Sequence, residues 1–136
     1  MTHLENYTGD YSGLFGRVKG IDGAYATIKN IKVNATTISG NNYVGSLVGK
    51  AEEYVLIDYS DAGTEYVNTA NVNGNNYVGG FVGYVGLSVR MLGAFDNSGQ
   101  VTAEGNYIGG IIGQLVAGAG TKSTGSNTYN FGAGLS

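Results

Sequence analysis

The chain is 136 residues long and contains 25 glycines, one histidine and no proline, cysteine or tryptophan. Without cysteine it can form no disulfide and no thiolate zinc site, and a single histidine, His3, excludes histidine-rich metal sites and most Ser–His catalysis. The net charge of −3 and the scattered lysines and arginines argue against nucleic acid as a partner, and the absence of any run of 18 apolar residues argues against membrane insertion.

The first element along the chain is a seven-residue, glycine-ended block that occurs four times, at residues 10–16, 43–49, 77–83 and 107–113. The closing glycines lie 33, 34 and 30 residues apart, and a Gly-Asn-Asn or Gly-Asn lead-in precedes each of the last three blocks. A period of this length indicates a repeat architecture. We therefore predict a single repeat domain over residues 1–136, with units near 10–42, 43–76, 77–106 and 107–136, and we expect the chain to be a fragment of a longer protein.

Short β-prone stretches over residues 33–38, 67–72 and 94–101 come before the three lead-ins. Helical repeats are disfavoured because glycine interrupts almost every window, and a propeller blade needs about 40–45 residues. Residues 51–57 are the only plausible helical turn and read equally well as a strand. The pattern predicts an all-β parallel β-solenoid (β-helix) of about four coils, roughly 20 Å tall at ~4.8 Å per coil, with a right-handed connection favoured.

The asparagines of the lead-ins are predicted to stack at one corner of the coil and to hydrogen-bond along its axis. They are Asn41 and Asn42, Asn75 and Asn76, and Asn106. Sharp corners need a left-handed backbone, which glycine adopts freely and asparagine tolerates. The recurring glycines are therefore interpreted as corner and tight-packing residues.

The strand within each block is largely apolar at both parities, as expected for a strand that is covered on both sides. The alternation leaves open which set faces the core. The aliphatic–small–aliphatic set of Val48, Val82 and Ile112, together with Phe15, is the preferred inward set.

The blocks Ser12–Gly16, Gly45–Gly49, Gly79–Gly83 and Gly109–Gly113 resemble the GLUG motif of bacterial surface proteins. This motif occurs in adhesin-like proteins and in the non-catalytic part of some IgA-cleaving metalloendopeptidases. The resemblance covers residues 10–113 and departs from the motif at Ser46, Phe81 and Ile111. It implies an extracellular bacterial repeat with an adhesive or spacer role, and it carries no catalytic residues to this chain.

The densest acidic patch consists of Asp58, Asp61 and Glu65, with Glu52 and Glu53 nearby. A solvated face is the favoured interpretation, ahead of a cation site and of a carboxylate pair for glycoside cleavage. No phosphate-binding loop and no calcium-binding nonapeptide repeat occurs in the sequence. We predict no catalytic residue, no cofactor and no metal site.

Three of the eleven tyrosines, Tyr43, Tyr77 and Tyr107, share one repeat position and predict a stacked column. Structural packing with the hydroxyls at the rim is favoured over a sugar- or protein-binding stripe. Four tyrosines outside this position are the better candidates for a binding surface: Tyr54, Tyr59, Tyr66 and Tyr84.

These observations predict a non-enzymatic structural or adhesion module of a bacterial secreted or cell-surface protein. A spacer beside a protease catalytic domain and a polysaccharide-acting β-helix enzyme stay as alternatives. A host or cell-surface protein or a glycan is the expected partner, and the strand edges at the two ends of a short solenoid also favour end-to-end self-association.

Overall fold

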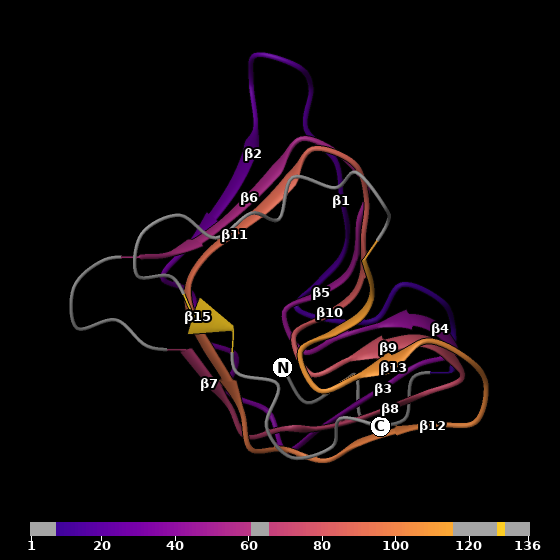
Figure 1. Ribbon diagram of the computed structural model, residues 1–136. Helices are drawn as coiled ribbons and strands as arrows, with labels where there is room; N and C mark the ends of the chain where they lie inside the picture. Colours follow the sequence, from indigo (N-terminus) through magenta and orange to yellow (C-terminus); the bar gives the residue numbers. More distant parts are fainter. Residues whose placement is uncertain (1–7, 61–65, 116–127, 130–136) are drawn as a thin grey trace.

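The computed structural model describes residues 8–60, 66–115 and 128–129. Its regular structure is all β, and the chain winds in stacked coils around one axis (Figure 1). The strands are β1 (Phe15–Val18), β2 (Ala26–Lys29), β3 (Thr37–Ser39), β4 (Asn42–Val44), β5 (Val48–Ala51), β6 (Val55–Tyr59), β7 (Tyr66–Asn68), β8 (Asn71–Gly74), β9 (Asn76–Gly79), β10 (Val82–Val85), β11 (Val89–Asn97), β12 (Val101–Ala103), β13 (Ile108–Gly109), β14 (Ile112–Leu115) and β15 (Thr128–Tyr129).

The strands form four parallel sheets that run along the axis, with the orders β1-β5-β10-β14, β15-β11-β6-β2, β12-β8-β3 and β13-β9-β4. A further strand, β7, also pairs with β11. Residues of the repeated block lie in register: Phe15 pairs with Val48, Val48 with Val82, and Val82 with Ile112. The predicted parallel β-solenoid is confirmed.

The interior holds two hydrophobic cores. Figure 1 shows β3, β8 and β12 running beneath β4, β9 and β13 as a narrow arm that extends from a wider body. The body core contains Leu47, Phe81 and Phe95, and the arm core is built around Ile38, Val44 and Val72. Each coil therefore fills two compartments, and the repeated block crosses from one compartment to the other.

The set of Val48, Val82, Ile112 and Phe15 faces the body core, as preferred from the sequence: the two valines are fully buried and the other two side chains pack against them. The alternate residues Leu47, Phe81 and Ile111 are fully buried as well. The backbone bends there between two sheets, so consecutive side chains both point into the body.

The recurring glycines are required by close backbone approach, not by a left-handed backbone. A Cβ on Gly83 would lie 2.6 Å from the carbonyl oxygen of Gly49 and 2.6 Å from the nitrogen of Val44, and it would overlap the Tyr77 carbonyl oxygen. Gly49 is enclosed in the same way by Gly16 and Tyr43. The glycine that ends each block thus lies where a strand of one sheet is in direct contact with the backbone of the neighbouring sheet.

The left-handed backbone falls instead on the residue that follows each lead-in, which is a tyrosine. The φ angles of Tyr11, Tyr43, Tyr77 and Tyr107 are 59°, 60°, 57° and 65°, whereas the described glycines with positive φ are Gly23 and Gly93. The expectation that glycine and asparagine supply the left-handed corner is therefore wrong here. A side chain in this region costs roughly 1–2 kcal/mol, and ring stacking and backbone hydrogen bonds between coils offset that cost.

Ser46 stands where later coils have Gly80 and Gly110, and its buried Oγ has no hydrogen-bond partner among the described residues. Because a buried hydroxyl without a partner is destabilising by about 1–3 kcal/mol, we expect Ser46→Ala to raise the free energy of unfolding by about 1 kcal/mol in urea titrations. Ser12→Ala is the matched control, because its buried Oγ donates to the Ser39 carbonyl at 2.6 Å. It should lower stability, and equal losses in both variants would contradict the assignment.

Candidate functional site

The most regular surface feature is a column of four tyrosine rings that climbs the outer face of β4, β9 and β13. The ring centroids of Tyr11 and Tyr43 lie 5.2 Å apart, those of Tyr43 and Tyr77 4.6 Å, and those of Tyr77 and Tyr107 4.8 Å. The planes of neighbouring rings differ by only 4–8°. The predicted stacked column is confirmed, and it gains a fourth member, Tyr11.

A second row of side chains, on β1, β5 and β10, faces this column. Arg17, Lys50 and Tyr84 occupy one register position in successive coils. The Tyr84 ring meets Tyr43 edge to face at 5.7 Å, and the Lys50 ammonium lies 4.8 Å from the Tyr43 centroid and 5.1 Å from that of Tyr84. We call the column and this facing row the aromatic corner.

The aromatic corner is packed against itself. Burial, and then the neighbouring phenols, raise the pKa of Tyr43 above its ordinary value. Because the inner rings cover one another's faces, the column offers mainly ring edges to the solvent. A sugar ring stacks on an aromatic face, so this geometry favours the structural interpretation of the column.

A row of asparagines lies beside the column at the tip of the arm. Asn75 Nδ2 donates to Asn41 Oδ1 at 3.3 Å, and Asn76 Nδ2 donates to Asn42 Oδ1 at 3.0 Å. In the first coil Asp10 takes the asparagine position, where its carboxylate accepts hydrogen bonds from the Asn41 side chain and the Asn42 backbone, both at 3.0 Å. The predicted axial hydrogen bonds are confirmed for these four asparagines, whereas Asn106 joins the row through its backbone nitrogen, which donates to Asn76 Oδ1 at 2.7 Å.

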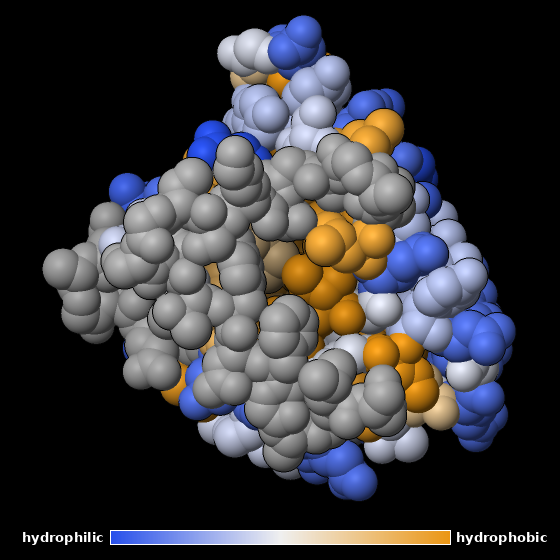
Figure 2. Space-filling model, in the orientation of Figure 1, coloured by the Kyte–Doolittle hydropathy of each residue, from blue (hydrophilic) through white to orange (hydrophobic). Residues whose placement is uncertain are grey.

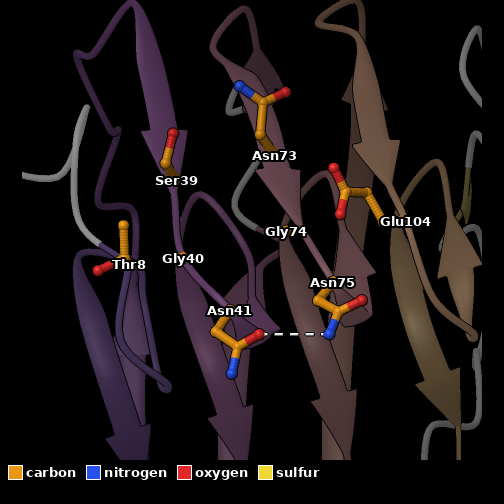
Figure 3. A pocket seen from close by; sticks show the side chains of 8 residues that line it. All are labelled: Thr8, Ser39, Gly40, Asn41, Asn73, Gly74, Asn75 and Glu104. Atoms are coloured by element: carbon orange, nitrogen blue, oxygen red, sulfur yellow. Dashed lines mark hydrogen bonds between the residues drawn. The ribbon is translucent and has the colours of Figure 1, made fainter.

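A shallow polar pocket of about 360 Å³ opens on this asparagine row. Figure 3 shows its lining side chains coming from successive coils, with a hydrogen bond that joins Asn41 to Asn75 of the next coil. The lining residues are Thr8, Ser39, Gly40, Asn41, Asn73, Gly74, Asn75 and Glu104. The pocket offers amide, hydroxyl and carboxylate groups, which suit a ligand rich in hydroxyls.

The two glutamates beside the predicted acidic patch pair with cations of the first coil. Glu52 pairs with Arg17, and Glu53 Oε1 lies 3.2 Å from Lys19 Nζ. Hydrogen bonds from the hydroxyl and the backbone of Ser60 lower the pKa of Asp58. Asp61 and Glu65 lie outside the described residues, and within the described part no three His, Cys, Asp or Glu side chains could jointly hold a metal.

The ion pair of Glu52 predicts a pH dependence of stability. The hydrogen bond from the Arg17 guanidinium, together with its charge, lowers the pKa of Glu52 below its ordinary value of 4.5. The pair therefore stabilises the fold above that ordinary value, and its contribution is lost as the pH falls through the lowered folded-state pKa. In urea titrations the stability difference between the wild type and Glu52→Gln should shrink below pH 4.5. A difference that stays constant across the acid range would contradict this.

The four tyrosines that were predicted as candidates for a binding surface lie in different environments. Tyr59 is a wrong candidate for a binding surface: its side chain is 1% exposed, because β6 buries every second residue and the hydroxyl is bonded to the Ile31 backbone. Tyr84 lies in the aromatic corner, and Tyr54 meets Tyr25 edge to face at 5.7 Å. Tyr66 belongs to β7, and its side chain lies outside the described part of the chain.

A buried asparagine ladder is the feature that the sequence interpretation missed. Asn68 Nδ2 donates to Asn97 Oδ1 at 2.9 Å, and both side chains are almost fully buried. Each also bonds the backbone two residues ahead, Asn68 at Ala70 and Asn97 at Gly99. The signal was an asparagine that recurs 29 residues later, each time two residues before a small residue.

Comparison with protein-family models, with curated proteins and with solved structures finds no match to this chain. No helix in the described residues is long and apolar enough to cross a membrane.

Proposed function

We propose that the chain is a non-enzymatic structural and adhesion repeat module of a bacterial secreted or cell-surface protein. The observation that carries the proposal is the in-register pairing of equivalent residues from coil to coil in the four sheets. Such a fold extends along one axis by adding equivalent coils and presents the same side chains repeatedly on its surface. These properties suit a stalk or a multivalent binding surface.

The polar pocket on the asparagine row is the proposed contact surface for a glycan or a host protein. Its amide groups can donate hydrogen bonds to hydroxyls and accept them, and the exposed carboxylate of Glu104 can accept them. The aromatic corner stiffens the adjacent wall of the coil. The pairing of Glu52 and Glu53 with basic side chains supports a structural role for these two acids.

The test is display of the chain on the surface of a non-adherent bacterium. Adherence to epithelial cells and binding to a glycan array should exceed the values for bacteria that display the membrane anchor without the chain. Glu104→Ala at the pocket should reduce both severalfold, whereas Asp22→Ala in an exposed turn should leave them unchanged. Adherence equal to that of the anchor alone would favour the spacer role, and release of reducing sugars from a polysaccharide panel would overturn the non-enzymatic assignment.

A further inference from the structure

The tyrosine column places equivalent rings of successive coils next to one another. The three successive centroid distances are 5.2, 4.6 and 4.8 Å, and the rings are parallel to within 8°. Neighbouring rings are therefore stacked face to face in successive coils, within the distance range of an aromatic contact. A bond between two ring carbons requires the rings to turn out of this stack about their side-chain bonds.

One end of the column is also open to an oxidant from the solvent. The sequence has no cysteine and no tryptophan, and Met91, one of its two methionines, is fully buried. Tyr107 is 49% exposed, whereas Tyr11, Tyr43 and Tyr77 are half-buried. An oxidant can reach Tyr107 directly, the Tyr77 ring is stacked on Tyr107, and the Tyr43 ring is stacked in turn on Tyr77.

We propose that the column is a site of oxidative coupling, at which hydrogen peroxide and a haem peroxidase join neighbouring tyrosines into a dityrosine that links adjacent coils. Each of two phenols loses its hydroxyl hydrogen as one electron and one proton. The two radicals form a carbon–carbon bond between the positions ortho to the hydroxyls. The hydrogens on those carbons then move to the oxygens and restore aromaticity, and the peroxide is reduced to two waters.

The geometry selects which tyrosines couple. Tyr77 belongs to both of the closest pairs, with Tyr43 at 4.6 Å and with Tyr107 at 4.8 Å. Because a neighbour in the same chain is always in contact, its effective concentration far exceeds that of a tyrosine on another molecule. The coupling is therefore intramolecular, and it binds successive coils covalently along the axis.

The test treats dilute full-length chain with a haem peroxidase and a stoichiometric amount of hydrogen peroxide, and isolates the monomer under denaturing conditions. Dityrosine fluorescence should appear in the monomer with a yield independent of protein concentration. Trypsin separates Tyr43, on peptide 33–50, from Tyr77, on peptide 51–90, and from Tyr107, on peptide 91–122. Mass spectrometry should find 51–90 joined to each of the other two, at the summed mass less two hydrogens.

Two variants locate the coupling. Tyr77→Phe removes both close pairs and should lower the monomer yield severalfold, whereas Tyr25→Phe, at an exposed tyrosine outside the column, should leave it unchanged. Tyr107→Phe should abolish only the link from 91–122 and keep that between 33–50 and 51–90, which tests the proposal even where Tyr77→Phe fails to fold. Dityrosine confined to covalent dimers, or an unchanged yield in folded Tyr77→Phe monomer, would overturn the proposal.

Discussion

Gly83→Ala is expected to lower the free energy of unfolding by about 3 kcal/mol, the upper end of the range for overpacking. The added methyl would meet only backbone: the Gly49 carbonyl oxygen and the Val44 nitrogen, each 2.6 Å away, and the Tyr77 carbonyl oxygen. Backbone held in two sheets cannot rotate aside as a flexible side chain can. Urea titration followed by circular dichroism measures the loss.

Gly23→Ala is the matched control for this substitution. Gly23 has nothing within 4 Å of the position of a Cβ, but its φ of +84° strains any side chain. We expect a loss of roughly 1 kcal/mol from backbone strain alone. If Gly83→Ala were no more destabilising than Gly23→Ala, the close approach of the two sheets at the end of each block would be wrong.

Asn97→Ala is expected to lower the free energy of unfolding by about 3 kcal/mol, because it removes three buried hydrogen bonds, among them the side-chain bond between the two coils. Asn97 Oδ1 accepts from Asn68 Nδ2 at 2.9 Å and from the Gly99 nitrogen at 3.2 Å, and its Nδ2 donates to the Gly99 carbonyl at 3.0 Å. The same substitution at Asn75, which is only partly buried, should lose less than ~1 kcal/mol because water replaces the amide.

A double-mutant cycle with Asn68→Ala tests whether the ladder acts as a unit. The two substitutions should be less destabilising together than their sum, because removal of either residue already breaks the bond between the two coils. Additive losses would show that each asparagine serves only its own turn, and the proposed axial coupling would fail.

The coil and its period could be predicted from the sequence because the same residues recur at the same spacing. The glycine-ended blocks, the stacked asparagines and the tyrosine column all depend on equivalent positions lying one above another, and a repeat guarantees that. Phe15, Val48 and Val82 paired as the alignment of the blocks implied.

The features that could not be predicted from the sequence depend on contacts between different sheets. No single repeat unit reveals those contacts. The left-handed position fell on Tyr43 and not on Asn42, because the ring stacks on the tyrosines of the neighbouring coils. Tyr59 was predicted to lie on a binding surface because it stands outside the repeated tyrosine position, yet the alternation of β6 turns it inward. The buried pair of Asn68 and Asn97 was missed because polar residues in glycine-rich segments usually mark turns.

The central claim is that equivalent coils stack in register and stabilise one another. Its most direct test is the free energy of unfolding of a chain that carries a second copy of residues 43–76, inserted after residue 76 so that the repeat stays in phase. The inserted coil adds its own stability and one more interface, so the free energy of unfolding should rise as the solenoid lengthens by about 4.8 Å. A value equal to or below that of the parent chain would contradict the in-register solenoid.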